Sequence, residues 1–116
     1  MNLKTDNKMA YFYLITAIVA EIFATTLMKD TNGFTVFWPS VFTILGYIVA
    51  FYMLSLCIQT IPTGIIYALW SGFGIIGIAV LGWIVHKQTL DLPAIAGILL
   101  ILLGVLVIKI FSKSIS

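Results

Sequence analysis

An acidic side chain, Glu21, lies inside the first long apolar stretch of the chain, at residues 9–28. If this stretch crosses a membrane as a helix that enters near Tyr11, Glu21 lies about 15 Å further along the axis, at 1.5 Å per residue. The hydrocarbon core of a bilayer is about 30 Å thick, so we expect the carboxyl group near its midplane. Because an acidic group at that depth is costly to insert, its presence predicts a functional site.

The helical face that carries Glu21 contains further side chains at spacings of three and four residues. They are Tyr11, Leu14, Ala17, Ile18 and Thr25. The small side chains among them predict room for a ligand beside the carboxyl group. A structural ion pair is the alternative interpretation. It is disfavoured because Lys29 is eight residues away and Lys109 lies near the end of another apolar stretch.

Aromatic side chains in two later stretches are candidates to complete such a site. Tyr67 and Trp70 are three residues apart, and Trp70 lies about 9 Å along the axis from Gly64, deeper than the usual interfacial belt of tryptophans. An aromatic pair near a carboxylate attracts organic cations through cation–π interaction and charge, although plain helix packing is the alternative. Tyr47 also lies deep within a span, where its hydroxyl needs a partner, either Glu21 or a local group.

The composition indicates that lipid is the solvent for most of the surface. Of 116 residues, 62% are hydrophobic and 9% are charged, and the mean hydropathy is +1.18, whereas a soluble domain has about 25% charged residues. The net charge of +2 is too small and too dispersed to predict nucleic-acid binding. A lone Cys57 excludes an internal disulfide, and we expect no metal, no cofactor and no enzymatic activity.

Four apolar stretches have membrane-spanning length, at about residues 9–28, 34–58, 64–85 and 92–111. Their apolar runs are continuous and not alternating, which excludes a transmembrane β-barrel. Polar tails at residues 1–8 and 112–116 flank this single membrane domain, residues 9–111. The expected fold class is an all-α integral membrane protein with four transmembrane helices per chain.

Assembly with a second copy is expected, because four helices are too few to enclose a polar pathway. Transporters commonly obtain two-sided access from inverted repeats, and neither half of this chain resembles the other. The lysines are divided almost evenly between the two sides of the membrane, so the positive-inside rule gives a weak bias. An antiparallel homodimer satisfies both observations.

Glycines in the third and fourth stretches suggest where helices meet or bend. Gly97 and Gly104 are seven residues apart on one face, so they are a candidate dimer interface where two backbones approach closely. Gly72 and Gly74 mark either a hinge for alternating access or a packing groove of small residues.

Several motifs resemble the small multidrug resistance family, over almost all of residues 9–113. They are Ala20-Glu21 with residues 25–29, residues 33–40 with Trp38-Pro39-Ser40, residues 61–72 with Tyr67 and Trp70, residues 90–94, and Gly97 to Gly104. Ala24 stands where the family's guanidinium exporters usually carry tryptophan. The chain is therefore more similar to the quaternary-ammonium and multidrug members.

The resemblance implies an antiparallel, dual-topology homodimer in a bacterial plasma (inner) membrane that exchanges protons for hydrophobic, quaternary-ammonium cations. It implies that Glu21 binds proton and cation in turn, and that Tyr47, Tyr67 and Trp70 line the site. Three alternatives remain open: a guanidinium or polyamine exporter, one subunit of a heteromeric pair, and a structural membrane protein without transport.

Overall fold

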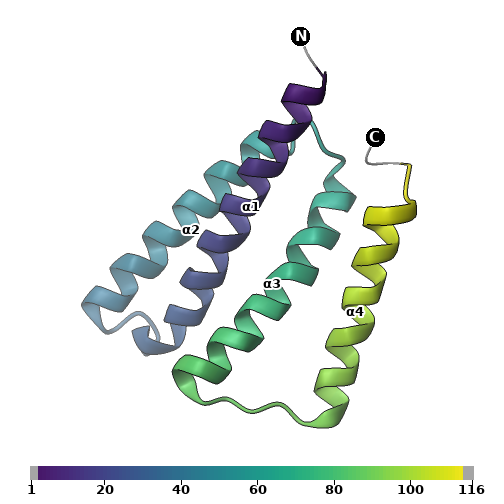
Figure 1. Ribbon diagram of the computed structural model, residues 1–116. Helices are drawn as coiled ribbons and strands as arrows, with labels where there is room; N and C mark the ends of the chain where they lie inside the picture. Colours follow the sequence, from purple (N-terminus) through teal and green to yellow (C-terminus); the bar gives the residue numbers. More distant parts are fainter. Residues whose placement is uncertain (1–2, 114–116) are drawn as a thin grey trace. The chain divides into compact units, whose positions relative to one another are not determined.

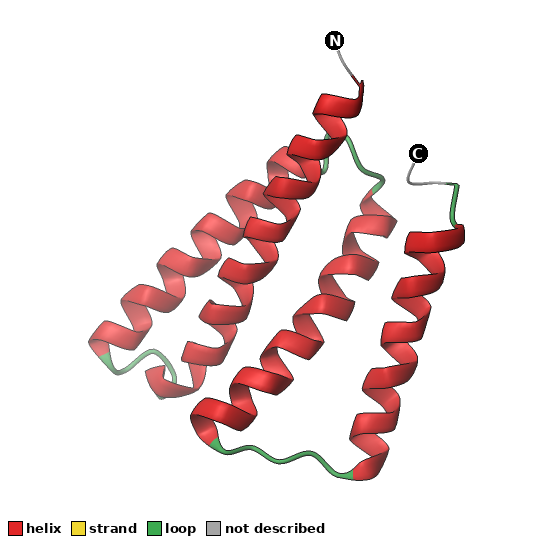
Figure 2. Ribbon diagram, viewed as in Figure 1, coloured by secondary structure: helices red, strands yellow, loops and turns green. Residues whose placement is uncertain are grey.

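The computed structural model describes residues 3–113, with side chains from residue 8 onward, and consists of long helices joined by short loops. The helices are α1 (Leu3–Met28), α2 (Phe37–Cys57), α3 (Thr63–His86) and α4 (Leu92–Phe111), with a one-turn 3₁₀ helix η1 at Lys29–Thr31 (Figure 2). The chain divides after Thr60 into two compact units, and each unit is a hairpin of two helices: α1 with α2, and α3 with α4 (Figure 1). The outermost parts of the predicted tails, residues 1–2 and 114–116, lie outside the described residues.

Each helix is long and apolar enough to cross a bilayer. The apolar spans comprise 24, 21, 24 and 20 residues, with mean hydropathy between 1.7 and 2.9, which suffices for a hydrocarbon core of about 30 Å. Large apolar side chains are exposed on every helix, for example Phe12, Phe51, Trp83 and Leu103. Helices that expose apolar surface in this way are solvated by lipid. The predicted all-α class with four membrane-spanning helices is confirmed.

Two helix starts differ from the expected positions. Helix α1 begins at Leu3, so it continues through most of the expected polar tail, where neither glycine nor proline interrupts a helix. Helix α2 begins at Phe37 instead of residue 34. The three residues Asn32, Gly33 and Phe34 have φ angles of 47°, 69° and 64°, which a right-handed helix cannot contain. The ends of α3 and α4 lie within one residue of the expected positions.

The loop between α3 and α4 is held at both ends. Lys87 closes α3 in the left-handed conformation (φ 55°), and the backbone N–H of Gln88 donates to the Gly82 carbonyl at 3.1 Å. At the other end, Asp91 Oδ1 accepts a hydrogen bond from the Ala94 backbone N–H at 3.1 Å and caps α4. Residues 87–91 are therefore a short connection with defined geometry.

Small side chains allow α1 and α2 to approach closely. A Cβ atom added to Gly46 of α2 would lie 2.9 Å from the Cβ of Ala24 and 3.4 Å from the Ala20 carbonyl oxygen of α1. Other small side chains on these two helices are also buried: Ala10, Ala17, Thr43, Ala50 and Cys57. Lipid tails are as apolar as the side chains, so close packing of this kind holds membrane helices together. The contact at Gly46 thereby determines the register of α1 against α2.

The second unit has its own close contact, at Gly72 of α3. A Cβ atom added to Gly72 would overlap the buried Val105 side chain of α4, so the valine occupies the space that the glycine leaves. Helix α3 is continuous through Gly72 and Gly74, and a hinge at these residues stays a prediction. By contrast, a Cβ atom at Gly97 or Gly104 would meet nothing within 4 Å.

Replacing Gly46 by valine is expected to destabilise the α1–α2 hairpin. The added side chain must displace the Ala24 methyl group and backbone, which are not flexible, and overpacking of this kind costs about 1–3 kcal/mol. The matched control is Gly64→Val, because the space around Gly64 is open. Unfolding in a mild detergent, followed by circular dichroism, measures both variants. Equal stability of the two would contradict the close contact at Gly46.

Candidate functional site

Three side chains of α1 and α2 form a hydrogen-bonded chain that ends on the membrane carboxyl group. Thr25 Oγ1 donates to Glu21 Oε1 at 2.7 Å, and the Tyr47 hydroxyl lies 2.5 Å from the same Oγ1. Thr25 has one hydroxyl proton, and it is given to Glu21, so Tyr47 must donate to Thr25. Both O–H groups therefore point toward the carboxyl group and stabilise negative charge on it.

Helix periodicity and the small-residue contact together build this chain. Thr25 follows Glu21 by four residues, so it lies one turn away on the same face of α1. Tyr47 directly follows Gly46, and Thr25 directly follows Ala24, the residue that Gly46 contacts. The close approach of the two helices thus brings the tyrosine and threonine hydroxyls within hydrogen-bond distance.

The other carboxyl oxygen, Glu21 Oε2, is buried and has no hydrogen-bond partner among the described residues. Lys29, the nearest lysine in sequence, is exposed, and the ion pair considered as an alternative is not formed in the described part of the chain. A buried carboxylate without a full set of partners costs several kcal/mol. Glu21 Oε2 is therefore a buried carboxyl oxygen that the described residues leave without a partner.

The other residues predicted on the Glu21 face are mostly packed. Ala17 is fully buried, Leu14 and Ile18 nearly so, and Tyr11 is half-buried. These small and branched side chains contact their neighbours and do not face open space in this structure. Their role as walls of a substrate pocket stays a prediction.

The predicted aromatic pair belongs to the second unit. Tyr67 and Trp70 lie one turn apart on α3. Tyr67 has 72% of its surface exposed, whereas Trp70 is half-buried. A ring as exposed as that of Tyr67 is accessible to a ligand or to a second chain. Their participation in a site with Glu21 stays a prediction.

Sequence reasoning placed Thr25 on the correct face but missed its role as the link between Glu21 and Tyr47. The Tyr47 hydroxyl was expected to bond either Glu21 or a local group. It bonds Thr25 of α1, and Thr25 in turn bonds Glu21. The spacing of four residues between Glu21 and Thr25 was the sequence feature that could have predicted their hydrogen bond. The hydrogen bond between Thr25 and Tyr47 depends on the close helix contact at Gly46, a residue that the sequence did not single out.

Replacing Thr25 by valine removes both hydrogen bonds while it keeps the shape of the side chain. The Tyr47 hydroxyl and Glu21 Oε1 lose their partner, so we expect the free energy of unfolding to fall by about 1–3 kcal/mol. Thr25→Ser keeps the hydroxyl and is expected to preserve most of the stability. The control is Thr16→Val, which removes a bond within α1 to the Phe12 carbonyl. Equal losses of unfolding free energy in Thr25→Val and Thr16→Val would argue against the hydrogen-bonded chain from Tyr47 through Thr25 to Glu21.

Comparison with known proteins identifies the family to which this chain belongs. Residues 9–101 match the model of the family described as Small Multidrug Resistance protein. The chain is 53% identical over 104 residues to the multidrug transporter EmrE of Escherichia coli (strain K12), covering 90% of this chain and 94% of the relative. It is 43% identical over 104 residues to the quaternary ammonium compound-resistance protein QacE of Escherichia coli, with the same coverage. It is 39% identical over 106 residues to QacG of Staphylococcus sp. (strain ST94), covering 91% and 99%. The chain therefore belongs to the small multidrug resistance family, and to the EmrE-like group within it.

Proposed function

We propose that this chain exports hydrophobic and quaternary-ammonium cations in exchange for protons, and that Glu21 binds each of them in turn. The names of its relatives support the substrate class, since they include a multidrug transporter and quaternary ammonium compound-resistance proteins. The observation that carries the role of Glu21 is its buried oxygen Oε2, which has no hydrogen-bond partner among the described residues. Transport, not catalysis, is the activity of such a protein.

The two oxygens of Glu21 have different tasks in this proposal. Oε1 accepts the hydrogen bond from Thr25, so Oε2 is the atom that takes the proton or faces the cation. Either ligand neutralises the same charge, and neither binds well once the other is present. Exchange of one for the other then follows from a single carboxyl group, without a second binding site.

Aromatic surface supplies the preference for hydrophobic cations. The rings of Tyr47, Tyr67 and Trp70 are the proposed contacts, because a ring face attracts an organic cation and tolerates many shapes. A cation bound by rings and one carboxylate needs no fixed set of hydrogen-bond donors. This combination favours a broad range of lipophilic cations.

Proton entry drives export when the protein exposes Glu21 to one side of the membrane at a time. The proposed assembly is an antiparallel homodimer in a bacterial inner membrane, in which a second copy supplies the inverted repeat that a single chain lacks. Helix α4 supports this assembly, because it exposes most of its apolar side chains. Its two glycines, Gly97 and Gly104, also have open space in front of them.

Titration with tetraphenylphosphonium tests the shared carboxyl group. Because protons compete with the cation for Glu21, the affinity should fall as the pH is lowered, by up to about ten-fold per pH unit for each proton displaced. Cation binding should release protons from the native protein in detergent. Glu21→Gln should abolish both the proton release and the pH dependence.

Asp91→Asn is the matched control, because Asp91 lies outside the spans and asparagine also caps a helix. This variant should keep the native proton release. Folded native protein that binds no tetraphenylphosphonium at any pH would contradict the multidrug function. Binding of guanidinium in its place would indicate the guanidinium exporter.

Replacing Gly104 by leucine tests the proposed interface on α4. A bulky side chain at a close helix crossing costs about 1–3 kcal/mol, and a loss of 1.4 kcal/mol weakens association about ten-fold. We expect single-molecule photobleaching to show fewer dimers for Gly104→Leu. Gly64→Leu, at a glycine that is equally open in the structure, should leave the dimer fraction unchanged. Unchanged dimerisation of Gly104→Leu would place the interface elsewhere.

A further inference from the structure

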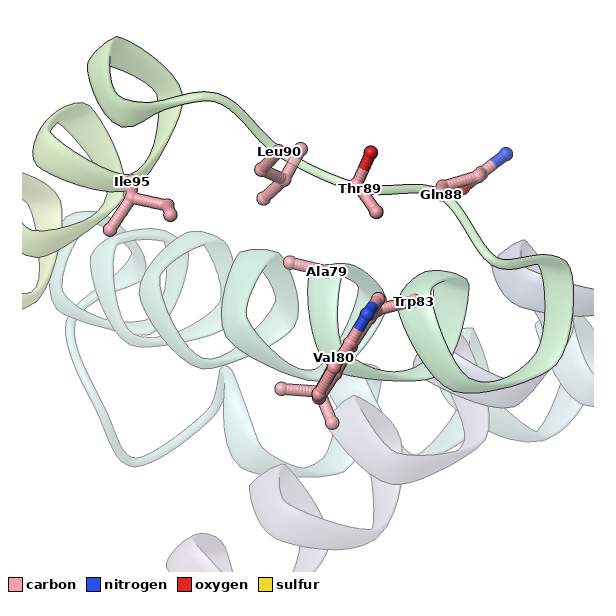
Figure 3. A pocket seen from close by; sticks show the side chains of 7 residues that line it. All are labelled: Ala79, Val80, Trp83, Gln88, Thr89, Leu90 and Ile95. Carbon is pink, nitrogen blue, oxygen red and sulfur yellow. The ribbon is translucent and has the colours of Figure 1, made fainter.

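The loop that joins α3 to α4 passes over the end of α3 and leaves a groove beneath it (Figure 3). The groove has a volume of about 330 Å³. Val80 and Trp83 come from α3, Leu90 from the loop and Ile95 from the first turns of α4 (Figure 3). It lies entirely within the second unit, and none of the residues proposed to bind protons or exported cations lines it.

The groove lies where the membrane surface is expected. Helix α3 ends at His86 and α4 begins at Leu92, so residues 87–91 connect the two spans outside the hydrocarbon. Trp83 is three residues from the end of α3 and has 61% of its surface exposed. Tryptophan at such a position usually lies at the level of the lipid headgroups. The groove therefore extends from the headgroup level toward the hydrocarbon.

Its two ends differ in chemistry. Leu90 and Ile95 make one end apolar, whereas Gln88 and Thr89, toward the other end, carry an amide and a hydroxyl on the side of the loop that points away from α3 (Figure 3). Lys87, which directly precedes Gln88, is exposed and adds a positive charge. Asp91, the acidic residue of the loop, keeps its negative charge but lies at the far end of the loop from Lys87, where one carboxylate oxygen caps α4. An apolar slot with donors and a lysine at one end complements a lipid with a negative headgroup.

The backbone at the polar end has a defined conformation. Lys87 has the left-handed conformation that ends α3, and the Gln88 N–H is bonded to the Gly82 carbonyl. The Gln88 side chain folds back over Gly82, since a Cβ atom added there would lie 2.7 Å from Gln88 Oε1. A site whose polar groups are already placed loses less conformational entropy on binding.

We propose that this groove binds an anionic phospholipid, with an acyl chain along Val80 and Ile95 and the phosphate near Lys87, Gln88 and Thr89. This lipid site is independent of the proposed transport function, since it shares no residue with the hydrogen-bonded group of Glu21, Thr25 and Tyr47.

Tryptophan quenching by brominated lipids measures this binding directly. The full-length chain with Trp38→Phe and Trp70→Phe retains Trp83 in the wall of the groove. It is reconstituted in phosphatidylcholine vesicles that contain brominated phosphatidylglycerol or, separately, brominated phosphatidylcholine. One lysine near a membrane surface contributes about 1 kcal/mol, so we expect phosphatidylglycerol to bind at Trp83 about five-fold more strongly.

Two variants in the same background, each with a matched control, separate the contribution of the lysine from that of the apolar slot. Lys87→Gln should abolish the preference for phosphatidylglycerol, whereas Lys29→Gln, in the loop after α1, should preserve it. Val80→Phe fills the slot and should reduce quenching by both lipids, whereas Val49→Phe, at an exposed valine of α2, should not. Circular dichroism confirms the fold of each variant. Equal quenching by the two lipids at Trp83, a preference that survives Lys87→Gln, or quenching that Val80→Phe does not reduce, would overturn the proposal.

Discussion

Burial of one carboxyl group in a hydrocarbon layer is the constraint on which the rest of this structure depends. A charge at that depth is unfavourable unless it is hydrogen-bonded, neutralised or paired. The chain meets half of this requirement itself, because Thr25 and Tyr47 direct their hydroxyls toward Glu21 Oε1. Oε2 has no partner among the described residues. In the proposed function, an exchangeable proton or cation supplies that missing partner. Under that proposal, this incomplete stabilisation by the protein is what makes the group suitable for exchange.

Precise helix packing makes this arrangement possible in so small a chain. Lipid gives little hydrophobic force between helices, so their separation depends on the shapes that meet. Gly46 and Ala24 bring the helix axes close, and the neighbouring residues Tyr47 and Thr25 then reach each other. A bulkier residue at Gly46 therefore affects the site through the backbone, although it touches no polar atom of it.

The two helical hairpins differ in what they offer. The α1–α2 unit holds the hydrogen-bonded carboxyl group. The α3–α4 unit has a tight contact between Gly72 and Val105, and it presents aromatic rings, open glycines and a surface groove. Polar chemistry is thus concentrated in one hairpin, while the other carries the surfaces proposed to meet the substrate, a second copy and lipid.

The sequence by itself determined the four helices and identified Glu21 as the candidate functional residue. In lipid each backbone must satisfy its own hydrogen bonds, so long apolar runs can only be helices, and an acidic residue within one is rarely without function. Only the tertiary structure decided that Thr25 joins Glu21 to Tyr47, that α2 starts after the left-handed residues 32–34, and that the last loop covers a groove. Periodicity shows which residues share a face of one helix, but not the register between two helices. That register depends on which side chains interlock, as Gly46 and Ala24 do.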